Sequence, residues 1–348
     1  MTRRRGLLCS GLAASILLAP AITGLSAGSE EAAAGQGKPG SGDRLNGFVL
    51  AKLDVPRAEI LQGGPARDSI PRVDDPHFAS PAEASWVVPG NPVVGVVLGG
   101  EARAYPVHIL EYHQVINDEI GGVPVAVTYD PLAGSPAVFL RKVGLRKVGV
   151  GKESAGKKGE RTLRFGISGL VYQCNFVLYD LETESLWSQL RGSSIAGSFA
   201  GTRLERVPAW QVPLGAWLVR HPESKVLVRP LPRRIDYRYS PFSAYWVSET
   251  IPFPVAARDE RYHPKEVVLG VEVDGVERAY LGSILTAAGG RIVDELRGRK
   301  LRVAYDSESG TFAWEMPEDL RATDAYWFAW KAFHPKTQIW RSGASSPR

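Results

Sequence analysis

The stretch that decides the fold occurs twice, first as Gly95-Val-Val-Leu-Gly-Gly-Glu-Ala-Arg-Ala-Tyr105 and again as Gly270-Val-Glu-Val-Asp-Gly-Val-Glu-Arg-Ala-Tyr280. The identical positions, at one constant spacing, are Gly95, Val96, Gly100, Arg103, Ala104 and Tyr105, and Gly270, Val271, Gly275, Arg278, Ala279 and Tyr280. Farther along, Ile109-Leu110 returns as Ile284-Leu285, Asp118-Glu119 as Asp294-Glu295, and Tyr129-Asp130 as Tyr305-Asp306. One supersecondary unit used twice explains this pattern most simply, so the sequence predicts an internal duplication.

The pattern within each copy predicts a β-rich fold. In the first copy, expected strands over 93–98 and 102–107 flank Gly99-Gly100, a dipeptide typical of tight hairpin turns. A helix is expected over 107–117 and a further strand over 123–129. Because short strands dominate and no long helical crossover is visible, we expect an α+β, mostly β fold with antiparallel-rich short strands and a few short helices.

Composition divides the rest of the chain into segments. Residues 229–265 are rich in Pro and aromatic residues and too apolar for a free linker, so we expect them to pack across both copies. The predicted segments are a signal peptide or membrane anchor (1–27), a flexible linker (28–45), an irregular segment (46–74), a first copy (75–228), a connector (229–265) and a second, shorter copy (266–340).

The N-terminus predicts export to the periplasm or the cell exterior. Three arginines at positions 3–5 precede a mostly apolar run that ends at Leu25-Ser26-Ala27, a small-residue pattern typical of signal peptidase cleavage. Cleavage there would remove three arginines and lower the formal net charge from +5 to +2, so the basic balance does not predict nucleic-acid binding. It would also leave Cys174 as the single cysteine, which excludes an internal disulfide and an all-cysteine metal site.

The charged segment 141–164 carries nine basic residues against Glu153 and Glu160. Such a run is usually a solvated loop, and the alternative is contact with an anionic partner at the cell surface.

Several motifs of the first copy resemble a bacterial family known as domain of unknown function 3179. They are Gly-Glu-Ala-Arg-Ala-Tyr-Pro (100–106), Ile-Leu-x-x-His-x-x-Ile-Asn-Asp (109–118), Gly-Gly-Val-Pro-Val-Ala-Val-Thr-Tyr (121–129), Phe-Gly-Ile-Ser-Gly-Leu-Val-Tyr (165–172), Leu-Trp-Ser-Gln (186–189) and Phe-Ala-Gly-Thr-Arg-Leu (199–204). The second copy looks like a degenerate version of the first. The resemblance brings no established reaction with it.

One departure from the family pattern bears on function. Where the family usually has Cys-Pro-Leu-Cys-Gly, this chain has Asp130-Pro131-Leu132-Ala133-Gly134. Two thiolates on a turn suit a soft metal or disulfide exchange, and neither Asp130 nor Ala133 supplies a thiol. An Asp at the end of a strand suits turn capping, and Asp306 recurs in the second copy, so we interpret Asp130 first as structural.

His113 is the best single candidate for chemistry, because it is expected on the apolar face of its helix and the second copy has Ala288 in its place. A buried neutral histidine is the competing interpretation. Cys174 is expected on a strand with Tyr172 and Phe176 on the same face, either as a small buried side chain or as a thiol beside a base. The histidines at 221 and 334 each precede a proline and are interpreted as helix C-caps.

These residues define a candidate pocket and three hypotheses. The expected pocket residues are His113, Tyr129, Asp130, Tyr172, Cys174 and Trp187, with His113 and Asp130 as candidate metal ligands. The first hypothesis is an exported cell-envelope protein that binds a ligand or partner and does not catalyse. The second is an exported metal-dependent or redox enzyme that uses His113, Asp130 and Cys174, with a transition metal as cofactor. The third is an envelope interaction module that acts through segment 141–164.

Overall fold

The computed structural model describes residues 43–144, 160–230 and 235–342. All described residues belong to one compact unit. The predicted signal segment, most of the flexible linker and most of the basic segment 141–164 lie outside the described residues. Among the described helices, none has the length and apolarity that a membrane span requires.

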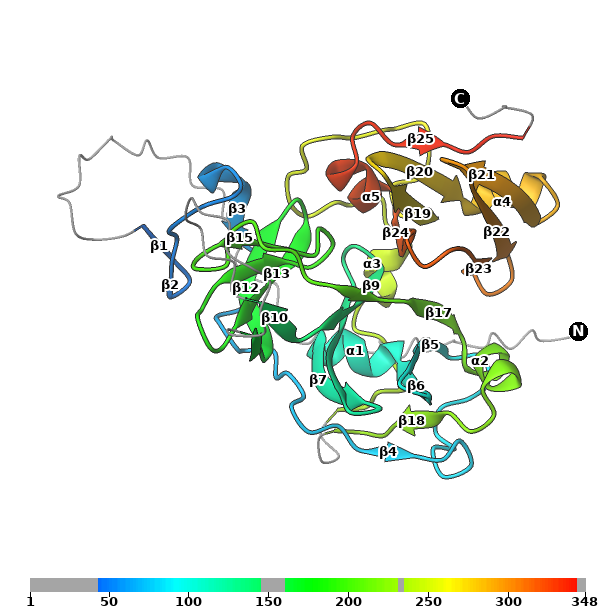
Figure 1. Ribbon diagram of the computed structural model, residues 1–348, viewed down its shortest axis with the longest axis horizontal. Helices are drawn as coiled ribbons and strands as arrows, with labels where there is room; N and C mark the ends of the chain where they lie inside the picture. Colours follow the sequence, from blue (N-terminus) through cyan, green and yellow to red (C-terminus); the bar gives the residue numbers. More distant parts are fainter. Residues whose placement is uncertain (1–42, 145–159, 231–234, 343–348) are drawn as a thin grey trace, which may run out of the picture. The chain divides into compact units, whose positions relative to one another are not determined.

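The first copy contains a sheet with the strand order β17-β5-β6-β18-β4 and a second sheet with the order β16-β9-β8-β7 (Figure 1). Helix α1 connects the two sheets, and α2 follows β17. The bounds are β4 (Phe78–Ala79), β5 (Pro92–Leu98), β6 (Glu101–Pro106), α1 (Val107–His113), β7 (Val115–Ile120), β8 (Val123–Asp130), β9 (Ser135–Leu140), β16 (Arg206–Val207), β17 (Ala209–Pro213), α2 (Leu214–Arg220) and β18 (Lys225–Leu227). All pairings are antiparallel except the one between β18 and β6.

The second copy repeats this arrangement with one sheet of order β24-β19-β20-β25 and one of order β21-β22-β23. Strands β5 and β19 begin 175 residues apart, at Pro92 and Val267, and β25 pairs with β20 in parallel as β18 does with β6. The bounds are β19 (Val267–Val273), β20 (Val276–Leu281), α4 (Gly282–Ala287), β21 (Arg291–Leu296), β22 (Arg299–Asp306), β23 (Thr311–Glu315), β24 (Arg321–Tyr326), α5 (Trp327–Phe333) and β25 (Gln338–Ile339). The predicted mostly β fold is therefore confirmed, and the repeated strand order is consistent with the predicted internal duplication.

The first copy differs by a long insertion. Residues 141–208 stand between β9 and β17, where the second copy has only 316–320 between β23 and β24. Four strands of the insertion, β12 to β15, and β3 from the segment before the first copy form a five-stranded sheet of order β15-β14-β13-β12-β3. The remaining bounds are β1 (Arg44–Leu45), β2 (Phe48–Val49), η1 (Arg57–Glu59), β3 (Ile60–Gln62), β10 (Lys142–Gly144), β11 (Glu160–Thr162), β12 (Phe165–Tyr172), β13 (Asn175–Asp180), β14 (Leu186–Ser188), β15 (Ser193–Ala196) and α3 (Ser243–Trp246).

The repeated glycine of the opening stretch is explained by a tryptophan. A Cβ added at Gly95 would lie 2.3 Å from the Trp217 ring, and one added at Gly270 would lie 2.2 Å from the Trp330 ring. These distances are far below van der Waals contact, so only glycine allows each tryptophan to lie flat on its strand. The tryptophans thereby hold α2 and α5 against the hairpins of their own copies.

The repeated Arg-x-Tyr has an equally direct cause. Arg103 Nη1 and the Tyr105 hydroxyl donate to the Asp118 carboxylate at 2.6 and 2.5 Å. In the second copy, Arg278 and Tyr280 donate to Asp294, both at 2.7 Å. Each carboxylate ties the first hairpin of its copy to the strand after the short helix, and all these groups are largely buried. Charge-assisted hydrogen bonds of this kind are the stronger ones in proteins.

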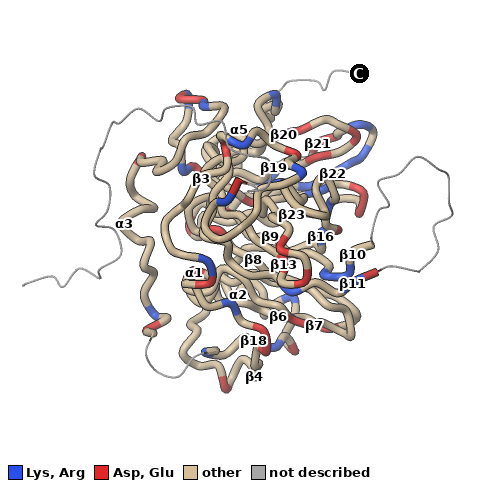
Figure 2. The backbone as a smooth tube through the Cα atoms, turned by 90° about the vertical axis from the view of Figure 1, so that its left-hand side faces the viewer, with Lys and Arg blue, Asp and Glu red and all other residues tan. Residues whose placement is uncertain are grey.

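The two copies contact each other reciprocally. Strand β17 of the first copy contacts β23 of the second, while β24 of the second contacts β9 of the first. The Trp210 and Trp314 rings stack with centroids 4.9 Å apart, and the Tyr326 amide donates to the Ala133 carbonyl at 2.7 Å. Because β17 and β24 occupy equivalent places in the two copies, each copy contributes the same strand to the contact. Lysine, arginine and acidic residues are interspersed around the molecule in Figure 2.

Three local predictions are wrong. The helix expected over 107–117 ends at His113, because Gln114 adopts a left-handed conformation with φ 59° and the chain then enters β7. The strand expected through Cys174 is interrupted, because Gln173 and Cys174 both have positive φ (54° and 55°) and form the turn between β12 and β13. The sequence also predicts a last helix from about Asp324, as its N-cap, to Phe333, but Asp324 lies inside β24 and the helix begins at Trp327.

Candidate functional site

The turn at Asp130–Gly134, where the related motif has two cysteines, is buried where several parts of the chain meet. Ala133 is completely buried, and it packs in one cluster with Cys174 from the insertion and Trp327 from the second copy. From the connector, the Tyr245 hydroxyl donates to the Leu132 carbonyl at 2.8 Å. The Tyr326 ring covers the opposite side, since a Cβ at Gly134 would lie 2.8 Å from it. The turn therefore joins the first copy, the insertion, the connector and the second copy.

Asp130 holds this junction together through four donors. Its Oδ1 accepts from the amides of Leu132 and Ala133 at 2.8 and 3.4 Å. Its Oδ2 accepts from Asn175 Nδ2 and the Phe176 amide at 2.7 and 2.8 Å. Burial raises the pKa of Asp130 to about 6, against the opposing effect of these hydrogen bonds. The hydrogen bonds from the Leu132 and Ala133 amides correspond to the turn-capping role that the sequence predicts for Asp130.

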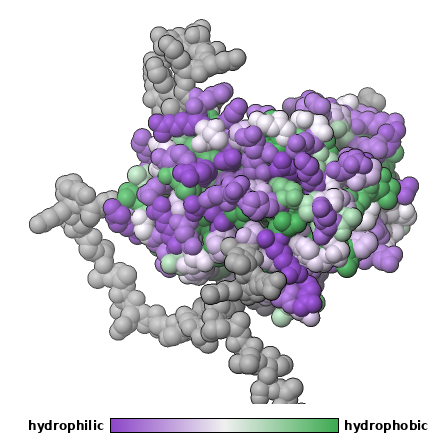
Figure 3. Space-filling view, turned by 90° about the horizontal axis from the view of Figure 1, so that it is seen from below, coloured by the Kyte–Doolittle hydropathy of each residue, from purple (hydrophilic) through white to green (hydrophobic). Residues whose placement is uncertain are grey.

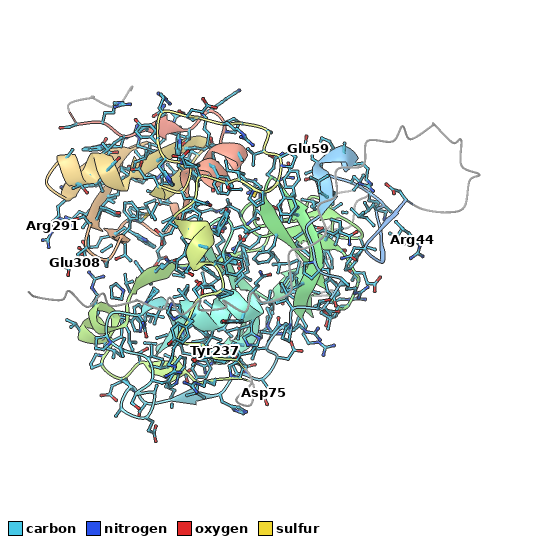
Figure 4. All side chains as sticks on the ribbon, turned by 180° about the vertical axis from the view of Figure 1, so that it is seen from behind. Arg44, Glu59, Asp75, Tyr237, Arg291 and Glu308 are labelled. Carbon is cyan, nitrogen blue, oxygen red and sulfur yellow. The ribbon has the colours of Figure 1, made fainter. Side chains whose placement is uncertain are left out.

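Both ring nitrogens of His113 are hydrogen-bonded, to groups other than those that contact Asp130. Its Nδ1 lies 2.6 Å from the Pro71 carbonyl, so it donates there, and its Nε2 accepts from the Tyr237 hydroxyl at 2.7 Å. Figure 4 labels Tyr237 close to α1. Burial lowers the pKa of His113, so the ring is the neutral tautomer in which one nitrogen donates and the other accepts. No hydrogen bond joins His113 to Asp130, and no group of three metal-ligating side chains occurs among the described residues.

Cys174 is a turn residue with an enclosed thiol. The residue is completely buried beside Ala133 and Leu190. Burial raises the pKa of the thiol to about 12, so it is not ionised at neutral pH. A neutral buried thiol with no histidine bonded to it is a poor nucleophile, and Cys174 packs as a small apolar side chain.

The other predicted pocket residues are spread over different parts of the fold. Tyr129 is buried next to Asp130 at the end of β8. Tyr172 meets the Phe333 ring edge-on at 5.7 Å. Trp187 lies in a separate core and donates its indole N–H to Asp180 at 2.9 Å. The structure thus brings Asp130 and Cys174 to one junction. Tyr129 packs in the core with Val127 and Tyr237, and Tyr172, His113 and Trp187 also lie in other surroundings. His221 and His334 occupy the C-cap positions of α2 and α5, as predicted.

Sequence reasoning missed Glu111, a buried acid at the edge of this junction. The residue is 3% exposed, and neither carboxylate oxygen has a hydrogen-bond partner in standard geometry. Burial raises the pKa of Glu111 to about 7, with a small opposing effect of the Ser240 hydroxyl. Its charge acts in turn on Tyr129 and on Tyr326 of the second copy, and raises the pKa of both. The second copy has Thr286 at this place, so the helix itself does not require an acid.

Comparison with known proteins gives a family for the chain. A family model described as protein of unknown function (DUF3179) matches residues 67–318. The chain belongs to the DUF3179 family. Within this DUF3179 protein the match includes the hairpin, the Asp130 turn, the insertion, the connector and most of the second copy. No curated protein and no solved structure matched the chain.

The two copies provide a matched test of the Asp130 junction. Asp306 is the equivalent exposed residue of the second copy and caps only its own turn, through the Glu308 amide and the Ser309 hydroxyl. We expect Asp130→Ala to lower the free energy of unfolding by about 3 kcal/mol or more, because four buried donors lose their acceptor. Asp306→Ala should cost about 1 kcal/mol. Urea unfolding followed by circular dichroism measures both, and equal costs would contradict a structural role for Asp130.

Glu111 makes stability depend on pH. Its folded pKa of about 7 lies above the ordinary value of 4.5, so the folded state holds a proton that the unfolded chain releases earlier. The stabilisation is complete below about pH 4.5 and is lost as pH rises through 7. Relative to Glu111→Gln, the wild type should therefore lose on the order of 3 kcal/mol between pH 4.5 and 8.

Urea unfolding of both proteins across this pH range measures the difference. The control variant is Glu308→Gln. Glu308, labelled in Figure 4, is exposed, so this substitution removes a carboxylate that is not buried. A constant difference between wild type and Glu111→Gln at all pH values would show that Glu111 finds a partner in solution.

Proposed function

We propose that this chain is an exported cell-envelope protein that binds a ligand or partner and does not catalyse a reaction. The observation that carries the proposal is that the side chains best suited to chemistry are used by the fold. Asp130 accepts four hydrogen bonds, both nitrogens of His113 are bonded, and the Cys174 thiol is buried and un-ionised at neutral pH. A ligand or substrate at any of them would have to displace contacts that hold the chain together.

The alternative is a metal-dependent or redox enzyme that uses His113, Asp130 and Cys174. It requires these three groups to act on one centre. His113 is bonded to the segment before β5 and to the connector, whereas Asp130 is bonded to its own turn and to the start of β13. The contacts therefore favour a binding protein over this enzyme.

The proposal of export rests on the basic N-terminal residues and the apolar run up to Ala27.

The kind of ligand is suggested by the surface. In the view of Figure 3, apolar residues form small patches between hydrophilic ones. Wide apolar patches typically mark protein partners, so this surface favours a small ligand held in a cavity.

Metal content and processing test the proposal together. The full-length precursor is expressed, and the exported form is purified without chelator or nickel resin. We expect N-terminal sequencing to find cleavage after Ala27 and mass spectrometry to find far less than one metal ion per chain. His113→Ala should leave the metal content unchanged, as should the control His108→Ala on the same helix. Near-stoichiometric metal that is lost only in His113→Ala, or failure of export, would overturn the proposal.

A further inference from the structure

A cavity of about 290 Å³ lies where the two copies meet. The first copy lines it with residues 136–138 of β9 and 205–209 around β16 and β17, and the second copy with Trp314 and residues 318–324. It is separate from the Asp130 turn, none of whose residues lines it. Its volume lies at the lower limit of the range of about 300–1,000 Å³ that is typical of ligand sites, so it has room only for a small ligand.

Arg206 is the polar anchor of the cavity wall. Its Nη1 donates to the Thr323 hydroxyl at 2.6 Å, and its Nη2 donates to the Leu190 carbonyl. The guanidinium carbon lies 5.4 Å from the centre of the Phe139 ring. All these partners are uncharged. Within the part of the chain that the structure describes, no ion pair links Arg206 to a carboxylate.

Two other arginines with little exposure do have a counter-ion, whereas Arg141, like Arg206, is part-buried and donates only to uncharged groups. Arg103 pairs with Asp118 at 2.6 Å and Arg278 with Asp294 at 2.7 Å. The pKa of Arg206 is lowered to about 10, mainly by burial; the charge of Glu272 opposes this shift, and the charges of Arg321 and Arg203 add to it. A part-buried cation without a counter-ion is costly, and a bound anion would remove much of that cost.

The acids near the cavity do not fill this role. Asp319 is bonded to Arg299 at 2.7 Å, and Glu205 and Glu318 are exposed side chains whose charge water and salt screen. Burial raises the pKa of Asp324 to about 7, which keeps part of its population neutral at physiological pH. Arg206 and Asp324 are therefore the enclosed ionisable groups of the cavity wall, and of the two only Arg206 is charged in nearly all molecules at physiological pH.

The remaining wall offers an aromatic surface. Trp314 lines the cavity and is fixed by its stack on Trp210, with the ring planes 26° apart. A flat ring against this surface would gain the contact energy typical of stacked aromatic pairs. A planar guanidinium matches the two oxygens of a carboxylate in a bidentate arrangement.

We propose that the cavity between the two copies binds a small aromatic carboxylate, whose carboxylate group pairs with Arg206 and whose ring lies against Trp314. The proposal rests on the proposed binding function and gives it a site and a ligand class. Because both copies line the cavity, binding of the ligand also links the two copies.

Isothermal titration calorimetry of the purified full chain with benzoate, acetate, inorganic phosphate and the uncharged analogue benzamide tests the assignment. We expect benzoate to bind and benzamide to bind at least about tenfold more weakly, because it lacks the charge that Arg206 recognises. Acetate and phosphate, which have no ring, should also bind more weakly than benzoate. This comparison needs no variant and so does not depend on the folding of a mutant.

Arg206→Gln should weaken benzoate binding at least about tenfold. The control Arg302→Gln removes the same charge at an exposed position paired with Glu315 and should leave binding unchanged. Equal affinity of wild type and Arg206→Gln, or no benzoate binding at all, would overturn the site. Acetate or phosphate binding as tightly as benzoate would overturn the role of Trp314. Export and metal content would be untouched by these results, so failure here is distinct from failure of the proposed function.

Discussion

The carboxylate of Asp118, held by Arg103 and Tyr105, is the interaction on which the fold of each copy depends, and Asp294 repeats it with Arg278 and Tyr280. It fixes the first hairpin against the strand that follows the short helix. Because the groups are largely buried, removal of the arginine would leave a buried carboxylate without its counter-ion. The strands on either side are thereby placed, and with them the helix between them and the turn at the end of the next strand.

That turn shows how one buried carboxylate can join several segments of a chain. Asp130 accepts hydrogen bonds from its own turn and from the insertion, and Ala133 is small enough to be covered by Cys174 and the second copy. The same acid in the second copy, Asp306, is exposed and caps only its own turn. The difference lies in the surroundings, since the insertion and connector cover the first copy's turn. Among the described ionisable side chains without an oppositely charged partner are Glu111 at the edge of the junction and Arg206 in the wall of the cavity.

The hairpins and the duplication were predictable because their signals are local: glycine turns, alternating strands and a repeated Arg-x-Tyr. The helix end at Gln114 and the turn at Gln173-Cys174 could not be predicted. Their residues adopt positive φ, which is rare for residues other than glycine, and no sequence pattern indicates it here. The candidate site was only partly predictable. Asp130 could be interpreted as a cap from its place after a strand, but the partner of His113 is Tyr237, which lies in a connector without periodic pattern.

Arg206 and Glu111 were missed for a related reason. What distinguishes each is the lack of a charged partner, and burial without a partner is a property of the packed chain that no short stretch of sequence encodes. Thr323, which Arg206 contacts, is 117 residues away. The repeat offered one usable signal, since Glu111 aligns with Thr286 and so is not required by the helix.

Residue-level hydrogen exchange of the amides of Leu132, Ala133 and Phe176 tests most directly whether the Asp130 turn is a structural junction. These amides donate to Asp130, so a junction that opens only when the two copies separate should protect them as strongly as the central strands β8 and β13. Exchange as fast as that of the exposed turn at Gly100, with the strands still protected, would instead show a turn that opens on its own. A mobile turn of that kind would contradict the account and return Asp130 to the list of groups available for chemistry.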